Sequence, residues 1–381
     1  MMKKNKKKNK IQRILIGLLE VFLVLVLLVG LAGIYFYKSG EMALKASAET
    51  QAPVMTTNLD EEQQVRLAYE NKMQNTLEWQ DGWVAYEGEV YEYNQDCLNF
   101  VLMGIDRSGT LEKETDLSDW NAGQADTIFL VSLNNRDKKV NIIAIPRNSM
   151  VHVDIYNEEK KCIDSIYNQI CLQYGYAGGG ELGLQKMKDC VSKLFYDLPI
   201  HGACAVSYDA IGIITDKIGG IEITLTEDMT KYQKSYTSGS DVTLTGKNVI
   251  PYLRYRDNSE LGSPTTRLTR QKEFMKVAIA KVVQEVKKNP PIVSEIYQAI
   301  VPYMNTDITL DKVVYLAAES IDYSITESSF YQLTGEDKKV EFENAKKDED
   351  FYDDYYLNEE VLKKSIMEIF YHKVVIETEK E

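Results

Sequence analysis

The stretch TIFLVSLNNRDKKVNIIAI, from Thr127 to Ile145, consists of two apolar runs joined by a short polar segment. The runs Thr127 to Leu133 and Val140 to Ile145 have the length and the β-branched content of buried strands. The segment Asn134 to Asp137 between them is typical of a hairpin turn. The stretch therefore predicts an antiparallel pair of strands.

A third apolar run precedes this hairpin. Leu98 to Gly104, LNFVLMG, predicts another buried strand, with Asp106 just beyond its carboxyl end. Because the hairpin is antiparallel, Asp126 before its first strand should lie beside Arg147 after its second. If the Leu98 strand runs parallel to the Val140 strand, Asp106 joins them at the edge where open α/β sheets bind ligands.

Helical and strand patterns alternate further along the chain. We expect helices at Ile163 to Tyr174, Glu181 to Phe195 and Asp209 to Ile218, the last ended by Gly219, and strands at His201 to Ser207 and Ile221 to Leu225. Strands that are apolar on both faces need helices on both sides of their sheet. The pattern predicts a three-layer α/β sandwich.

The N-terminus predicts a membrane anchor. Ile14 to Tyr37 is a run of 24 residues with one charge, Glu20, and at about 1.5 Å per residue it is long enough to cross a bilayer. Seven basic residues within residues 1–13 place that tail in the cytoplasm. A cleaved signal peptide is the alternative, but its apolar core would be shorter. Residues 38–95, with a helix expected at Glu61 to Trp79, would form a stalk outside the membrane.

The charge balance limits the partners of the protein. The formal net charge is -14, and the part after the basic tail is more acidic still. Such a body excludes nucleic acid and anionic lipid as partners held by general attraction, so an anionic ligand needs a local cationic cluster or a metal ion. The five cysteines contain no CxxC and match no metal motif. Either Cys171 and Cys190 form a disulfide, or the cysteines are buried and free.

A cationic cluster is encoded in LRYRDNSELGSPTTRLTRQ, Leu253 to Gln271. The pattern places Arg254 and Arg256 on one face of a strand, and Ser263-Pro264 begins a helix on which Arg267 and Gln271 share a face, with Arg270 beside them. Guanidinium groups suit phosphate oxygens, so the cluster indicates a diphosphate site. Its spacing fits salt bridges on an acidic surface equally well.

The boundary after residue 288 is marked by Asn289-Pro290-Pro291. We expect residues 96–288 to form the main domain and residues 289–381 an acidic, partly helical extension packed on it. Its helices are expected at Leu310 to Ser320 and Glu359 to Tyr371. Phe351 to Tyr356 is interpreted as a surface turn, with contact to sugar as the alternative.

The candidate residues favour phosphate chemistry. GxSxG, SxxK and HExxH motifs are missing from the sequence, and its three histidines are scattered. Magnesium is commonly held by one or two carboxylates together with substrate phosphates. Arginines and such a metal stabilise phosphoryl transfer without a covalent nucleophile from the protein.

An ordered set of segments resembles the LytR–CpsA–Psr family of cell-wall glycopolymer ligases. The set runs from Cys97 to Val286 and comprises NFVLMGID, ADTIFLVSLN, KKVNIIAIPRN, DKIGGIEI, LTGKNVIPYLRYRD and TTRLTRQ. The resemblance implies a central mixed sheet. It also implies an enzyme that moves a phosphoglycosyl polymer, such as a teichoic acid, from a polyprenyl diphosphate carrier to peptidoglycan on the outer face of a Gram-positive cell membrane.

The resemblance also assigns roles to the candidate residues. Asp106 and Asp126 would bind Mg2+. The diphosphate would be bound, and its charge stabilised during transfer, by Arg147, Arg254, Arg256, Arg267 and Gln271. Arg107 and Arg270 would assist. The lipid would enter an apolar pocket, which we expect to be lined by the helices between Ile163 and Ile218.

Two departures from the family pattern keep a second function open. Asn148 stands where the family usually has an acid after the arginine, and Ser263 to Thr266 replace an acid and a glycine. A protein that lacks these acids could bind the lipid diphosphate without transferring it, as a sensor. Transcriptional regulation is a weaker third hypothesis, because the anchor and the acidic body oppose DNA contact.

Overall fold

The structure is a computed structural model that describes residues 32–45, 53, 79–80, 82–111, 116–117, 122–255, 263–341 and 351–374. Three predicted features lie outside these residues: most of the membrane anchor, nearly all of the helix expected at Glu61 to Trp79, and Arg256. Within them, no helix is both long and apolar enough to cross a membrane.

The core is a six-stranded mixed sheet with the order β11-β8-β3-β4-β5-β12. Its strands are β3 (Cys97–Ile105), β4 (Ala125–Asn134), β5 (Lys139–Ile145), β8 (Gly202–Val206), β11 (Met304–Thr306) and β12 (Phe330–Gln332). The predicted hairpin is confirmed, because Ile128 pairs with Ile145 and Asn134 with Lys139 in antiparallel register. Since β3 is also antiparallel to β4, β3 and β5 run in the same direction, which is the condition under which Asp106 joins Asp126 and Arg147 at one edge.

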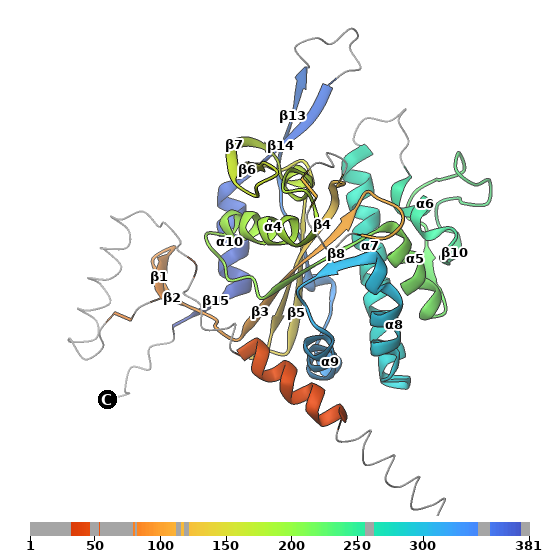
Figure 1. Ribbon diagram of the computed structural model, residues 1–381, viewed down its shortest axis with the longest axis horizontal. Coiled ribbons are helices and arrows are strands. Elements are labelled where there is room, and N and C mark those ends of the chain that lie inside the picture. Colours follow the sequence, from red (N-terminus) through yellow and green to blue (C-terminus); the bar gives the residue numbers. More distant parts are fainter. Residues whose placement is uncertain are drawn as a thin grey trace, which may run out of the picture.

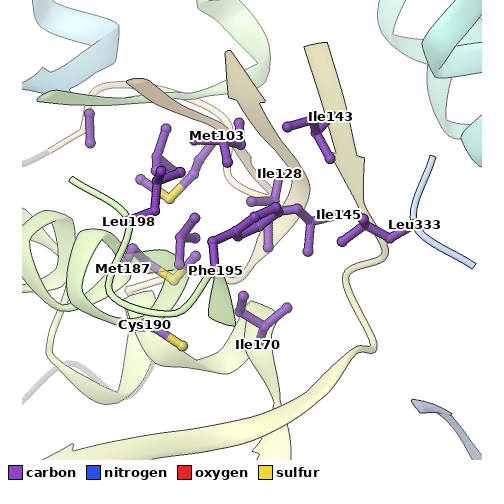
Figure 2. Packing of buried hydrophobic residues seen from close by; sticks show 14 of the residues in the cluster. Met103, Ile128, Ile143, Ile145, Ile170, Met187, Cys190, Phe195, Leu198 and Leu333 are labelled. Carbon is purple, nitrogen blue, oxygen red and sulfur yellow. The ribbon is translucent and has the colours of Figure 1, made fainter. Parts of the chain in front are cut away.

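One face of the sheet is covered by α4 (Gly180–Leu194) and α10 (Glu359–Phe370). Alternate residues of the strands point into this layer, as the two-residue period of a strand requires. Figure 2 shows the result, with Met103, Ile128 and Ile143 from the strands facing Met187 of α4 and Phe195 just after it. Phe195 and Met187 are fully buried, so this side is a closed apolar core.

The opposite face is covered by α5 (Tyr208–Lys217), α6 (Val249–Arg254), α7 (Ser263–Lys288), α8 (Ile292–Ile300) and α9 (Leu310–Glu319). Here Phe129 and Ile142 of the sheet pack against Met275 and Ile279 of α7. Helices thus lie on both faces of the mixed sheet (Figure 1), in agreement with the predicted layers.

Smaller sheets of two or three strands surround this body (Figure 1). They are β1 (Trp83–Tyr86) and β2 (Glu89–Tyr93) with β15 (Tyr371–Lys373), β6 (Met150–Tyr156) with β7 (Cys162–Gln169), β9 (Ile221–Thr224) with β10 (Asp241–Leu244), and β13 (Gly335–Glu341) with β14 (Phe351–Leu357). Short helical turns complete the chain: η1 (Ile170–Leu172), α3 (Gln173–Tyr176), η2 (Val301–Tyr303), η3 (Ser320–Asp322) and η4 (Glu327–Ser329). Residues 32–45 form a further helix before β1.

Three predicted elements are wrong. The helix expected at Ile163 to Tyr174 is strand β7 up to Gln169, because its backbone groups pair with β6. The strand expected around Leu253 is helix α6, and the turn expected at Phe351 to Tyr356 is strand β14, paired with β13. For β7 and β14 a partner strand pairs with the backbone, and for α6 the burial of Val249, Tyr252 and Leu253 favours a helix. Local spacing reveals neither.

The C-terminal segment is part of the sheet. Residues 289–291 lie between α7 and α8, and both edge strands, β11 and β12, come from the chain beyond them. β11 pairs with β8, and β12 runs parallel to β5. The helices expected at Leu310 and Glu359 are confirmed as α9 and α10.

Candidate functional site

Three strand ends bring the predicted acids and Arg147 together at one edge of the sheet. Arg147, just after β5, forms an ion pair through Nη1 with Oδ1 of Asp126 in β4. Its Nη2 donates to Oε1 of Gln124 at 2.7 Å. The antiparallel hairpin places Asp126 and Arg147 side by side, as we predicted from the sequence.

Gln124 also connects this pair to Asp106. Its backbone N–H donates to Oδ1 of Asp106 at 2.6 Å, and its carbonyl accepts from the backbone N–H groups of Asp106 and Asp126, each at 3.0 Å. The residue therefore holds the Asp106 carboxylate by its backbone N–H, the backbones of both aspartates by its carbonyl, and the guanidinium by its side chain. Fixed dipoles of this kind orient charged groups before a ligand arrives.

A buried thiol completes the surroundings of Arg147. Sγ of Cys171 lies 3.6 Å from Nη2, and the backbone N–H of Cys171 donates to the Arg147 carbonyl at 3.1 Å. Burial raises the pKa of the Cys171 thiol, although Arg147 partly opposes this. Burial alone would lower the pKa of Arg147, but Cys171, Asp126 and Asp106 more than offset it and raise that pKa. At neutral pH the site therefore holds a neutral thiol and a charged guanidinium.

An apolar cavity of about 400 Å³ opens beside these groups. Its lining combines the sheet with α5, α6 and α7, and includes Phe129, Ile211, Ile214, Phe274 and Ile279. Asp126, Arg254 and Gln271 are the charged and amide side chains in this lining. The cavity thus has an apolar body with polar groups from three distant segments.

The source of the lining differs from our expectation. Of the helices predicted between Ile163 and Ile218, α5 contributes, but no residue of α4 is part of the cavity wall among the residues that the structure describes. α4 packs on the other face of the sheet. Two helices beyond Ile218, α6 and α7, supply much of the wall instead.

Arg254 reaches the cavity from the end of a helix. It is the last residue of α6, and its guanidinium carbon lies 4.8 Å from the ring centroid of Tyr208 at the start of α5. This is within the range of a cation–π contact. The backbone N–H of Tyr208 donates to the Arg107 carbonyl at 3.1 Å, which ties Tyr208 to the loop that carries Asp106.

The remaining predicted arginines differ in their placement. Arg270 is 2% exposed, and it contacts Glu227 through Nη1 and the Tyr255 carbonyl through Nη2. Arg107 is half-buried beside Asp106. Arg267 lies in the first turns of α7, but its side chain and the whole of Arg256 are outside the described part.

All five cysteines are free, so the Cys171–Cys190 disulfide is not formed and the alternative of free thiols is confirmed. Cys97, Cys171 and Cys190 are buried, whereas Cys162 is exposed. No group of three or more His, Cys, Asp or Glu side chains within the described ranges is arranged to hold a metal ion.

Sequence reasoning missed three residues of the site: Gln124, Tyr208 and Cys171. Two of them had a usable signal. Gln124 lies two residues before Asp126 and so shares its side of the chain, and Tyr208 follows the end of β8, which is parallel to β3. Cys171 had none, because its position depends on the misassigned β7.

The comparisons with known proteins agree with this architecture. The polyisoprenyl-teichoic acid–peptidoglycan teichoic acid transferase TagU of Oceanobacillus iheyensis is 24% identical over 224 residues, which is 58% of this chain and 61% of TagU. The chain therefore spans less than two thirds of that relative. The structure of Bacillus subtilis TagV matches 72% of this chain and 96% of its own with 17% identity and a TM-score of 0.51. The structure of TagT bound to LI-WTA matches 72% of this chain and 89% of its own, with 20% identity and a TM-score of 0.50.

These two structural matches establish the fold alone. The family is established by the sequence, since the model of the LytR_cpsA_psr family matches residues 45–361, most of the chain. The chain belongs to the LytR_cpsA_psr family.

Proposed function

We propose that the protein is a phosphotransferase that moves a teichoic-acid-type glycopolymer from a polyprenyl diphosphate carrier to peptidoglycan. The observation that carries this proposal is the apolar cavity with Asp126, Arg254 and Gln271 in its lining and Arg147 paired to Asp126. A lipid diphosphate has the matching division, with an apolar chain and an anionic head. The name of the relative TagU includes both substrates.

The chain's own residues suit binding and charge stabilisation. In this proposal Arg147 exchanges its contact with Asp126 for phosphate oxygens, because a guanidinium fork fits them in two places. Arg254, held against Tyr208, and Gln271 bind the same head group from the other side of the cavity. The acceptor hydroxyl forms the new bond to phosphorus as the bond to polyprenyl phosphate breaks, and the polyprenyl phosphate that leaves takes up the proton lost by the hydroxyl. The arginines stabilise the charge that develops on the phosphoryl oxygens.

A magnesium ion fits the donors at this edge. Asp106 is exposed with Oδ1 oriented by Gln124, and Asp126 lies beside it near Arg147. The set of two carboxylates is too small for a complete protein cage, which is the usual situation for Mg2+ bound together with substrate phosphates. We propose that Asp106 and Asp126 hold the ion, which would neutralise charge on the diphosphate.

We further propose that the apolar run Ile14 to Tyr37 anchors the protein in the cell membrane, with the N-terminus in the cytoplasm and the catalytic domain outside. The basic tail supports this orientation. Both proposed substrates, a polyprenyl carrier and peptidoglycan, are found at that surface of a Gram-positive cell.

The test is a transfer assay with the full-length protein in detergent micelles. A polyprenyl diphosphate-linked glycan and a peptidoglycan fragment are supplied with Mg2+, and the phosphodiester-linked product is measured by mass spectrometry. Asp126→Ala should abolish product formation, whereas Asp137→Ala, an exposed acid in the turn at the other end of β4, should retain it. Undiminished turnover by Asp126→Ala would contradict the assigned site.

A non-catalytic lipid-diphosphate sensor is the alternative, and Asn148 favours it. The residue follows Arg147, and its carbonyl accepts from the Tyr355 backbone N–H of β14 at 2.9 Å. Its amide side chain cannot act as a base. If the wild-type protein binds the lipid diphosphate tightly but forms no product, with or without Mg2+, the sensor is the correct function.

A further inference from the structure

The helix of residues 32–45 is docked on α9. The Tyr37 hydroxyl donates to Oε1 of Glu319 at 2.6 Å, and the Ser39 hydroxyl donates to Oδ2 of Asp311 at 2.6 Å. The rings of Tyr37 and Tyr315 lie 5.2 Å apart. These contacts run along the length of α9 and fix the direction of the helix against it.

Gly40 allows the close approach between the two helices. A Cβ at this position would clash with the Asp311 carbonyl oxygen and lie 2.8 Å from Cβ of Tyr315. Both obstacles are rigid, one being backbone and the other the root of a side chain. A Cβ at Gly33, seven residues or about two helical turns earlier, would meet nothing within 4 Å. The helix therefore needs a glycine at position 40 and not at position 33.

The docked helix also closes one end of the central sheet. Leu44 is 1% exposed and packs with Leu98 and Phe100, at the start of β3. Glu319, the partner of Tyr37, lies 3.6 Å from Nζ of Lys138 in the β4–β5 turn. The helix thus contacts the start of β3 and lies near the turn between β4 and β5, whereas Asp106 and Arg147 follow the opposite ends of β3 and β5 (Figure 1).

The length of β3 separates the helix from the candidate site. From Leu98 to Asp106 the chain advances eight residues, which at about 3.3 Å per residue is about 26 Å. A strand in a packed sheet does not bend enough to bring its two ends together. The site therefore lies about 26 Å beyond the level at which the helix is attached.

The face of the helix that points away from α9 carries exposed apolar and aromatic side chains together with two exposed lysines, Lys38 and Lys45. Ile34, Tyr35 and Met42 are 62%, 70% and 66% exposed. Tyr35 and Met42 are seven residues apart and so share a face of the helix. The apolar run Ile14 to Tyr37 overlaps this helix from residue 32 onward, and exposed aromatic and apolar side chains at such a position suit the boundary between lipid head groups and acyl chains.

We propose that this docked helix sets the orientation of the whole domain. It rests on the proposed anchor and holds the α9 end of the sheet against the lipid bilayer, with the phosphate-binding edge turned toward the cell wall. A lipid-linked donor must then leave the head-group layer to reach the site, and the apolar cavity receives its chain. The partner of the exposed helix face is the bilayer surface.

The orientation is measured by quenching in liposomes that contain the full-length protein. A fluorescent donor is attached to a cysteine introduced at Ala318 in α9 or at Ser108 after β3, both exposed, in a Cys162→Ser background that removes the exposed native thiol. A short-range quencher is carried on outer-leaflet head groups. We expect the donor at position 318 to be quenched several times more strongly than the donor at position 108.

A glycine pair tests the docking itself. Gly40→Ala should release the helix from α9 and bring the quenching at the two positions close together, whereas Gly33→Ala should preserve the difference. Equal quenching at both positions in the wild-type background, or a full difference in Gly40→Ala, would overturn the proposal. If the protein failed to float with liposomes, the proposed anchor would be absent and the proposal would be overturned. None of these readouts depends on transferase activity, so they are separable from a failure of the proposed reaction.

Discussion

The two ends of the three central strands are built on opposite principles. At the carboxyl ends of β3 and β5, charged side chains gather around Arg147 beside an open cavity. At the other end, the start of β3 is closed by the helix of residues 32–45, by α9 and by His201, whose Nδ1 accepts from the Asn99 backbone N–H at 3.0 Å. Asn99 is fully buried there.

The difference separates function from stability within one sheet. Groups at the open end are held by hydrogen bonds that a phosphate could replace, so their loss should mainly affect ligand binding and turnover. Groups at the closed end have their partners inside the protein, so their loss should mainly affect folding. Substitutions of the same kind at the two ends should therefore give opposite results.

The largest expected effect is at Arg147. Arg147→Ala removes the guanidinium that faces Asp126 and Gln124, and we expect product formation to fall by roughly a hundredfold or more, the usual loss when one preorganised donor is removed. The free energy of unfolding should change little, since the ion pair is partly exposed. Transfer assays and denaturant unfolding on the same preparation measure the two quantities.

Arg136→Ala is the matched control at the closed end. Arg136 is an exposed arginine in the β4–β5 turn, one strand length from the site. It should keep full activity. If Arg136→Ala lost as much activity as Arg147→Ala, the two ends of the strands would not differ in function as we infer.

The next largest effect is expected at His201, and it concerns the pH dependence of the free energy of unfolding, not activity. Burial lowers its pKa to about 4 in the folded protein, against about 6.5 when unfolded. The unfolded chain therefore binds the proton first as the pH falls. Stability is complete above about pH 6.5 and decreases toward pH 4, by about 3 kcal/mol at most from this group. Denaturant unfolding between pH 4 and 7 measures the slope.

The comparison uses His201→Asn and, as a control, His152→Asn at an exposed position on β6. His201→Asn should flatten the decrease at low pH, and His152→Asn should leave the wild-type slope. Transfer activity of His201→Asn at neutral pH should remain near wild type wherever the protein is folded. An unchanged slope in His201→Asn would show that other groups cause the acid sensitivity.

The open end could be predicted because it follows from local rules. Strand lengths and the hairpin turn place Asp106, Asp126 and Arg147 at one edge, and the structure brings them together. The fold class followed from the same runs. The closed end could not be predicted, since it depends on contacts such as Tyr37 to Glu319 between segments far apart in the chain.

The arginine segment, Leu253 to Gln271, could be predicted only in part. Arg254 reaches the cavity as expected, but from the end of a helix, because Val249, Tyr252 and Leu253 bury one face of α6. Arg270, predicted as a phosphate helper, is instead surrounded by Glu227, Tyr252 and Tyr255. Sequence spacing identifies a cationic cluster, but burial decides which of its members can face a ligand.

A smaller effect at the open end is expected from Tyr208. Its ring faces the Arg254 guanidinium, and a contact of this kind contributes about 1 kcal/mol. Tyr208→Leu should weaken binding of the lipid diphosphate by about fivefold, which fluorescence titration of the full-length protein can measure. Tyr208→Phe keeps the ring and should bind nearly as well as wild type. Equal loss in both variants would mean that the hydroxyl, and not the ring, is required.

The smallest effect should come from Cys171, although its sulfur lies only 3.6 Å from Arg147. Burial raises the pKa of the thiol, so it stays neutral through the physiological range and offers only weak hydrogen bonding. Cys171→Ala should therefore reduce turnover by no more than about threefold, or about 0.6 kcal/mol, and leave the pH profile between pH 6 and 8 unchanged. A rise or fall in the wild-type rate near pH 8 that disappears in Cys171→Ala would show a thiolate in the site. Arg147 would then be neutralised from within the protein, and the open end would not be poised to receive phosphate.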